Sequence, residues 1–193
     1  MTIAEYLRFD DETPGKHEYF AGKVVAMAGG SSYHSAIAFN LSVAIGRRIA
    51  GTNCQGHTSD LRVGIPCVPS FSYPDMSVVC GPPQFDPRDP RENTVTNPKL
   101  VAEILSPSTE QIDRGRKFEN YLRLESLQEY VLVSQDQPLI TSYYRQPDGT
   151  WGAFAFATGL QDVLKLRSLS IEIPLSEIFA NVVFPPVDGV HGQ

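Results

Sequence analysis

The sequence has no excess of positive charge. Its 193 residues include 16 Lys and Arg against 22 Asp and Glu, which gives a formal net charge of -6 at pH 7. No global positive field therefore draws the chain to nucleic acid or to an anionic membrane surface. Any contact with nucleic acid must depend on a local basic patch or on a metal ion.

Long apolar runs and a secretory leader are also lacking. No uninterrupted apolar stretch approaches the ~18 residues that are needed to span a bilayer. The first residues, MTIAEYLRFDDE, have neither the basic region nor the apolar region of a signal peptide. We therefore expect no contact with a membrane and a cytoplasmic location.

Cysteine is scarce, with Cys54, Cys67 and Cys80 as the only examples. The count is odd and there is no CxxC pair, so neither a disulfide framework nor a zinc ribbon is indicated. We expect these cysteines to be small, partly buried apolar residues in a reducing compartment.

What remains is an ordinary globular composition, 41% hydrophobic and 20% charged. The length suits one domain over residues 1–193, with a core over about 5–180 and a loose C-terminal tail. Helical patterns cover residues 2–9, 33–51, 110–125 and 174–182. Strand patterns cover 17–20, 24–28, 58–65, 73–80, 99–105, 129–133, 139–145, 151–157, 163–167 and 170–173. This order predicts an α/β (α+β) fold with one mixed sheet flanked by helices and an N-terminal hairpin that turns at Gly22.

The Pro-rich connection over residues 81–98 is long for a compact domain. Such length is typical of functional or mobile loops.

Two carboxylates lie in strands that are otherwise apolar. Glu103 interrupts KLVAEIL, and Asp75 follows Pro74 in YPDMSVVC. If the strands are neighbours, the two carboxylates repel each other unless a cation lies between them. Oxygen-only ligation favours Mg²⁺ or Mn²⁺ over zinc. The alternative is that Glu103 pairs with an arginine and Asp75 caps a turn.

A lysine lies on the next predicted helix. Asp113, Lys117 and Tyr121 are spaced i, i+4, i+8 and therefore share one side of it. Because Phe118 and Tyr121 are expected to face the core, Lys117 borders the buried face and could reach back to the sheet. There an ammonium can position a nucleophile and stabilise developing negative charge. The alternative is a solvated Asp113–Lys117 ion pair.

The order of these residues resembles the PD-(D/E)XK nuclease superfamily. The matching elements are Pro74-Asp75 and Glu103-Ile104-Leu105. The superfamily usually has a lysine where this sequence has Leu105, which is a departure. Some members carry the lysine on the following helix instead, and Lys117 fits that migrated position.

The sequence is more closely similar to the bacterial Uma family of restriction-endonuclease-like proteins, over about residues 5–180. That family shows the patterns E-Y-x-x-G-x-V-x-M-A, a His at the head of the first helix, P-D, V-x-E-x-L-S-P-S-T, D-x-x-x-K and E-Y-x-x-V. The matching residues here are Glu18-Tyr19, Gly22, Val24 or Val25, Met27-Ala28, His34, Pro74-Asp75, Glu103 through Thr109, Asp113, Lys117 and Glu129-Tyr130. The resemblance implies a restriction-endonuclease-like core, and it bears on the fold with more force than on the substrate.

The resemblance also implies a site. The carboxylates of Asp75 and Glu103 and the main-chain carbonyl of Ile104 would hold Mg²⁺ or Mn²⁺, and Lys117 would orient the attacking water. By analogy with the superfamily, Glu18 is an extra acid at the rim, or else an ordinary hairpin residue. His34 could bind a phosphate or stabilise a leaving group, or else serve only to start its helix.

Three classes of function remain open. The first is a metal-dependent endonuclease that hydrolyses phosphodiester bonds in DNA, with RNA not excluded. The second is a catalytically silent nuclease fold that binds nucleic acid or a protein partner, and the third is a structural oligomer. Arg47, Arg48, Arg114 and Arg116 are candidate phosphate contacts, and the aromatic late strands suggest a homodimer.

Overall fold

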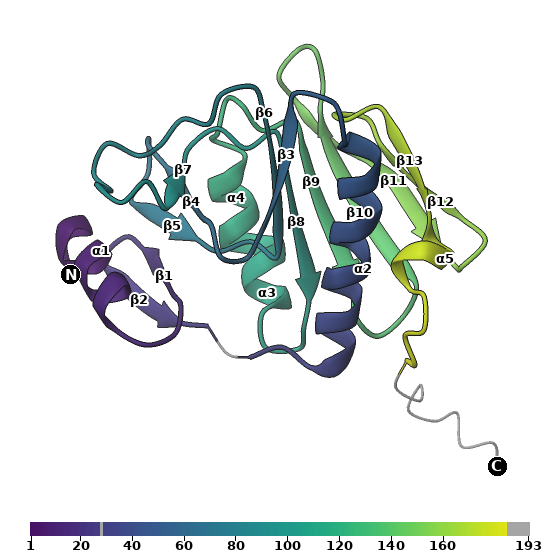
Figure 1. Cartoon of the computed structure of the whole chain (residues 1–193), viewed down its shortest axis with the longest axis horizontal. Helices are drawn as coiled ribbons and strands as arrows, with labels where there is room; N and C mark the ends of the chain where they lie inside the picture. The colour runs from purple at the N-terminus through teal and green to yellow at the C-terminus, as the bar shows by residue number, and fades with distance from the viewer. Residues whose placement is uncertain (28, 185–193) are drawn as a thin grey trace.

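The computed structural model describes residues 1–27 and 29–184, and it has a mixed α and β architecture (Figure 1). Its largest sheet has six strands in the order β11-β10-β9-β8-β6-β3. These strands are β3 (Cys54–Thr58), β6 (Met76–Cys80), β8 (Leu100–Leu105), β9 (Glu129–Ser134), β10 (Leu139–Arg145) and β11 (Trp151–Thr158). Only β8 and β9 run parallel within this sheet; the other neighbours are antiparallel. The predicted α+β fold with a mixed sheet is therefore confirmed.

A second sheet of five strands contains the N-terminal hairpin, in the order β2-β1-β5-β4-β7. Its strands are β1 (His17–Phe20), β2 (Lys23–Ala26), β4 (Arg62–Ile65), β5 (Ser70–Ser72) and β7 (Thr94–Val95), and β12 (Val163–Leu166) pairs separately with β13 (Ile171–Pro174). The hairpin turns at Ala21 and Gly22, both with positive φ, as a two-residue type I′ turn requires. The expectation of one sheet was wrong, because β5 pairs with the hairpin strand β1 and with β4, whereas β6 pairs with β3 and β8.

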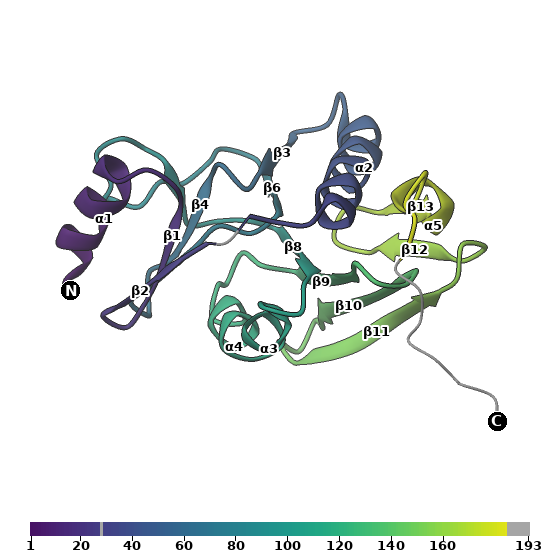
Figure 2. The same cartoon turned by 90° about the horizontal axis from the view of Figure 1, so that it is seen from below.

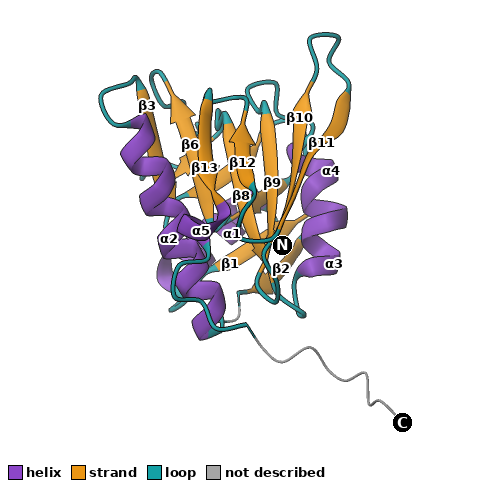
Figure 3. Ribbon diagram, turned by 90° about the vertical axis from the view of Figure 1, so that its right-hand side faces the viewer, coloured by secondary structure: helices purple, strands orange, loops and turns teal. Residues whose placement is uncertain are grey.

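Helices cover both faces of the six-stranded sheet (Figure 2). On one face lies α2 (Ser32–Ile49), next to α5 (Leu175–Ile178). On the other lie α3 (Glu110–Ile112), a π-helical turn (Asp113–Lys117) and α4 (Phe118–Tyr121), while α1 (Ile3–Glu12) packs on the N-terminal sheet. Figure 3 shows the same three layers edge-on, with α2 and α4 on opposite sides of the strands.

Strand β8 is buried on both faces, and its side chains divide between two cores. Leu100, Ala102 and Ile104 belong to the core under α2. Val101 and Leu105 belong to the core under α4, which also contains Tyr121. Glu103 lies on the same face of β8 as Val101 and Leu105. The sheet therefore directs its carboxylate towards the segment that carries Lys117.

The helix predicted over residues 110–125 is broken into three short pieces. The π-helical turn over Asp113–Lys117 separates two α-helical turns, and the helix ends at Tyr121 rather than near 125. The buried hydroxyl of Tyr130 donates a hydrogen bond to the Asp113 carbonyl at 3.0 Å. Such π-turns occur frequently at functional sites. The spacing of Asp113 and Lys117 still places both side chains inward.

Two cysteines form a disulfide, which the sequence did not indicate. β3 and β6 pair with Cys54 opposite Cys80, and the two are joined. Cys67 is free and exposed. The expectation of three unpaired cysteines was wrong because the pairing depends on strand register, which sequence spacing does not reveal.

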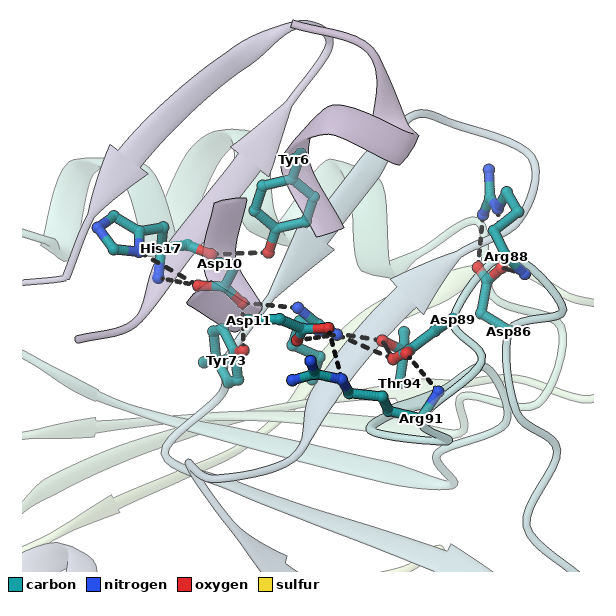
Figure 4. A network of polar contacts seen from close by, with 11 residues as sticks. Tyr6, Asp10, Asp11, His17, Tyr73, Asp86, Arg88, Asp89, Arg91 and Thr94 are labelled. Carbon is teal, nitrogen blue, oxygen red and sulfur yellow. Dashed lines mark hydrogen bonds and ion pairs between the residues drawn. The ribbon is translucent and has the colours of Figure 1, made fainter. Parts of the chain in front are cut away.

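A buried arginine links the N-terminal sheet to α1 and to the loop over residues 81–98 through ion pairs. The side chain of Arg62 is fully buried and contacts Asp10 at 2.6 Å and Asp89 at 2.9 Å. Asp10 also accepts hydrogen bonds from the main chain of His17 and from the hydroxyl of Tyr73 (Figure 4). The network thereby joins α1, the start of β1, β4 and the loop over residues 81–98.

Two expectations fall partly outside the described residues. Ala28 in the hairpin motif is not described, and the tail that we expected to be loose lies over residues 185–193. Within residues 1–27 and 29–184, no helix is both long enough and apolar enough to cross a membrane. That residues 1–193 form a single domain stays a prediction.

Candidate functional site

A cavity of about 890 Å³ opens between the carboxyl end of β8, the N-terminal half of α2 and the β1–β2 hairpin. The side chains predicted to be catalytic all line it: Glu18, His34, Asp75, Glu103 and Lys117. Ile104, whose main-chain carbonyl is the predicted third ligand, lines it as well. The fold therefore brings together residues that lie as many as 99 positions apart in the chain.

Asp75 and Glu103 come from neighbouring strands. β6 and β8 pair antiparallel with Met76 opposite Ala102, so the next residues in this register are Asp75 and Glu103. Asp75 Oδ2 accepts a hydrogen bond from the Ile104 amide at 2.7 Å. Glu103 is only 2% exposed, whereas the Asp75 side chain borders the opening. The two carboxylates therefore meet at the floor of the cavity.

Lys117 reaches this floor from the π-helical turn. Its Nζ lies 2.9 Å from Glu18, 3.2 Å from Glu103 and 3.2 Å from Asp113. The lysine side chain is 5% exposed, so these contacts are made away from bulk water. Asp113 and Lys117 do form the ion pair that the sequence left open, but the pair is buried and not solvated.

Glu18 belongs to the same cluster and is not an ordinary exposed hairpin residue. It is 6% exposed, and its Oε1 accepts a hydrogen bond from the Tyr73 amide at 3.1 Å. Tyr73 precedes Pro74-Asp75, so this bond joins β1 to the segment that carries Asp75. Burial raises the pKa of Glu18, and the nearby charge of Lys117 opposes that rise.

His34 lies in the first turn of α2, which Ser31 caps by accepting a hydrogen bond from the His34 amide. The ring also contacts the site: its Nε2 lies 3.3 Å from Asp75 Oδ2. Hydrogen bonding to Asp75 raises the pKa of His34, and the backbone of Ile104 adds to the rise. His34 thus faces the same two groups that are predicted to hold a metal, in addition to starting its helix.

The cluster holds more negative than positive charge. Burial raises the pKa of Glu103 well above its usual range, and Asp113, Asp75 and Glu18 add to the rise while Lys117 opposes it. Burial disfavours the ammonium of Lys117, but attraction to Glu103, Glu18 and Asp113 raises the pKa of Lys117 well above its usual value. Lys117 therefore stays charged, and one positive side chain cannot neutralise four carboxylates.

The donor atoms fit a hard cation that keeps several waters. Asp75 Oδ1 and Glu103 Oε2 accept no hydrogen bond from any residue in the described ranges 1–27 and 29–184. Each carboxylate thus retains one free oxygen beside excess negative charge. The described side chains form no group of three or more His, Cys, Asp or Glu that could hold a metal. Binding through two carboxylates, a main-chain carbonyl and water is typical of Mg²⁺.

The four arginines predicted to contact phosphate are not part of this cavity's lining. Arg48 pairs with Glu177 at 2.8 Å and Arg114 pairs with Glu110 at 2.7 Å. The guanidinium of Arg116 lies over the ring of Phe20, and Arg47 is exposed near the far end of α2. Their contact with nucleic acid stays a prediction.

Two side chains of the cluster were not among the predicted site residues. Asp113 is 2% exposed and lies against Lys117, and the hydroxyl of Tyr121 lies 3.5 Å from Glu103. The i, i+4, i+8 spacing of Asp113, Lys117 and Tyr121 was the available signal. It shows that the three share a side of the helix, but not that this side faces a carboxylate on the sheet.

Neutralising Glu103 should stabilise the metal-free protein. The raised pKa means that the folded protein binds a proton at Glu103 more readily than the unfolded chain, whose usual value is 4.5. Its stabilising contribution is therefore complete below pH 4.5 and is lost as the pH rises through the higher pKa of the folded state. At pH 8 with a chelator, Glu103→Gln should increase the free energy of unfolding by on the order of 1 kcal/mol.

Thermal unfolding at pH 5 and pH 8 measures this effect. The gain from Glu103→Gln should be larger at pH 8, and the exposed Glu119→Gln should change the midpoint little at either pH. A steep fall in the midpoint of Glu103→Gln in chelator would mean that Glu103 serves as a structural ion-pair partner of Lys117.

Comparison with known proteins identifies the family of this chain. Residues 3–176 match the family described as "Uma2: Putative restriction endonuclease". The chain belongs to the Uma2 family. Two Synechocystis proteins are similar to this Uma2 chain: "Uncharacterized protein slr1290", 38% identical over 95% of this chain and 94% of that protein, and "Uncharacterized protein sll1609", 34% identical over 78% and 84%.

A solved structure shares the fold of this Uma2 protein. It is described as "a putative nuclease belonging to DUF820" from Anabaena variabilis, and it superposes with a TM-score of 0.76 over 95% of this chain and 99% of that chain. The two sequences are 19% identical, so the likeness establishes a common fold.

Proposed function

We propose that this Uma2 protein is a metal-dependent endonuclease that hydrolyses phosphodiester bonds in DNA. The observation that carries the proposal is the contact of Lys117 Nζ with Glu103, at 3.2 Å, on the floor of a cavity that Asp75 also lines. Two carboxylates that can hold a metal ion, with an ammonium beside them, are groups that can promote hydrolysis of a phosphodiester. Lys117 supplies the positive charge that Leu105 cannot.

In this proposal, Asp75, Glu103 and the Ile104 carbonyl hold the metal. When bound, Mg²⁺ or Mn²⁺ supplies Lewis acidity towards the phosphate and the attacking water. Lys117 would orient that water through the N–H that points towards Glu103, and would stabilise negative charge that develops on the phosphate. Glu18 and Asp113 hold the ammonium in position from the two other sides.

His34 has a supporting role in the same proposal. Its contact with Asp75 orients the carboxylate, and its place at the cavity rim allows it to donate to a phosphate oxygen once a cation engages Asp75. A homodimer and a cytoplasmic location are further predictions, and RNA is not excluded as a substrate.

Calorimetry with Mn²⁺ tests the metal site directly. One site should be present in the native protein and should disappear in both Asp75→Asn and Glu103→Gln. Asp60→Asn is the matched control, because Asp60 is an exposed carboxylate that pairs with Lys16 beside the cavity. Undiminished Mn²⁺ binding in both site variants would contradict the assignment of the ligands.

Cleavage assays separate the classes of function. In the presence of Mn²⁺ or Mg²⁺, the purified protein should convert supercoiled plasmid to nicked or linear forms and should cut oligonucleotides. Asp75→Ala should do neither. Binding of nucleic acid and metal without cleavage would favour the catalytically silent fold. Failure to bind either one would favour the structural oligomer.

A further inference from the structure

A second large cavity lies at the opposite end of the six-stranded sheet. Its volume is about 850 Å³, and its lining includes Lys99, just before β8, and Gln128, just before β9. Because β8 and β9 are parallel, this cavity lies at their amino ends and the carboxylate site at their carboxyl ends. Lys99 and Glu103 are four positions apart along an extended strand, which corresponds to a distance of about 13 Å.

The two cavities differ in charge. Lys99, Arg123 and Arg167 line the second cavity, and Glu125 is the one acidic residue there. The first cavity has the reverse balance, with Glu18, Asp75, Glu103 and Asp113 against Lys16 and Lys117. In a chain with a formal net charge of -6, a cavity with an excess of basic side chains is a local exception.

Two of these basic side chains are not neutralised by the protein. Several other basic side chains face carboxylates, as Arg88 faces Asp86 and Lys165 faces Glu172. Within the part of the chain that the structure describes, the side chains of Lys99 and Arg123 make no ion pair and no hydrogen bond. An anion that enters the cavity would find both groups available.

The walls around these charges are fixed before any ligand arrives. The Asn97 side chain accepts a hydrogen bond from the Gln84 amide at 2.8 Å and donates one to the Pro82 carbonyl at 3.0 Å. These bonds join the two ends of the long loop over residues 81–98, and Gln84 and Asn97 both line the cavity. On another side, Arg145 donates to the carbonyls of Leu122 and Leu124, on either side of Arg123.

The remaining lining suits a ligand that carries a flat ring as well as an anion. Tyr144 lies in the lining, and the guanidinium of Arg167 is 5.9 Å from the centre of its ring. Thr96, Asn97 and Gln128 add hydroxyl and amide groups. The volume is within the range of about 300–1,000 Å³ that is usual for small-molecule sites.

We propose that this cavity binds a phosphate monoester of nucleotide size, with Lys99 and Arg123 on the phosphate and Tyr144 against the base. The phosphate monoester could belong to a free nucleotide or to the 5′ end of a short strand, because the two share this chemistry. The proposal does not rest on the nuclease function, since no residue of the carboxylate site is involved.

Calorimetry with adenosine 5′-monophosphate tests the site. The native protein should bind it, and the double variant Lys99→Gln/Arg123→Gln should bind at least tenfold more weakly. The matched control is Arg8→Gln/Lys23→Gln, which removes the same charge from two exposed positions outside the cavity and should bind as the native protein does. Adenosine, which lacks the phosphate, should bind far more weakly than the monophosphate.

Two further arms locate the ligand and identify its source. Asp75→Asn should leave binding of the monophosphate unchanged, which separates this site from the proposed metal site. A 5′-phosphorylated tetranucleotide that binds more tightly than the monophosphate, and loses that advantage in Lys99→Gln/Arg123→Gln, would identify a strand end as the source. Absence of binding up to millimolar ligand, equal weakening in both double variants, or loss in Asp75→Asn would overturn the proposal.

Discussion

Replacing Lys117 by methionine should reduce DNA cleavage by on the order of 100-fold or more, while Mn²⁺ affinity stays within a few fold. The lysine is not a ligand in the proposed site, so its loss should affect the reaction more than the binding of the metal. Lys117→Arg should restore little activity, because a planar guanidinium does not replace a compact ammonium among three carboxylates. Single-turnover cleavage and calorimetry measure the two effects separately.

The same change should also weaken the fold. Lys117 is the shared partner of Glu18, Glu103 and Asp113, and removing it leaves buried carboxylates without a positive neighbour. Loss of one partner from a buried ion pair typically costs about 3–5 kcal/mol. The double variant Lys117→Met/Glu103→Gln should recover part of that stability but no activity.

Lys16→Met provides the matched control for Lys117. Lys16 also lines the cavity, but its side chain is partly exposed and pairs with the exposed Asp60. Its loss should therefore leave cleavage within a few fold of the native rate. Full activity in Lys117→Met would contradict the migrated-lysine model, because cleavage would then not depend on this ammonium.

Replacing Arg62 by methionine should destabilise the protein by about 3–5 kcal/mol, because Asp10 and Asp89 would stay buried without their counter-charge. For a chain of this length, that corresponds to a fall in Tm of roughly 6–20 °C. Denaturant unfolding measures the change. Arg114→Met is the matched control: it breaks an exposed pair with Glu110 and should cost no more than about 0.5 kcal/mol.

The loss of Arg62 should also affect the carboxylate site. Tyr73 donates a hydrogen bond from its hydroxyl to Asp10 in the arginine network (Figure 4), and it donates another from its amide to Glu18 in the cavity. Tyr73→Phe removes only the first of these bonds and should keep the fold. If Arg62→Met costs no more than Arg114→Met, the network is dispensable to the stability of the fold.

Several features of the protein followed from the sequence because they depend on local spacing. Thr2 and Glu5 predict the capping box that starts α1, and both of its hydrogen bonds are present. Gly22 predicts the hairpin turn, and the alternation in KLVAEIL predicts that Glu103 shares a face with Val101 and Leu105. A carboxylate on an apolar strand was enough to indicate a compensating positive charge.

The tertiary structure decided which residues meet. Strand register set Cys54 opposite Cys80, and register also brought Asp75 beside Glu103. Pairing of β1 with β5 carried Glu18 from the N-terminal sheet to Lys117, and no spacing along the chain predicts that contact. Periodicity tells which way a side chain points from its own element. Which charge it meets there depends on the packing of elements that are distant in sequence, and that packing decides whether a buried carboxylate is paired, protonated or free to bind a cation.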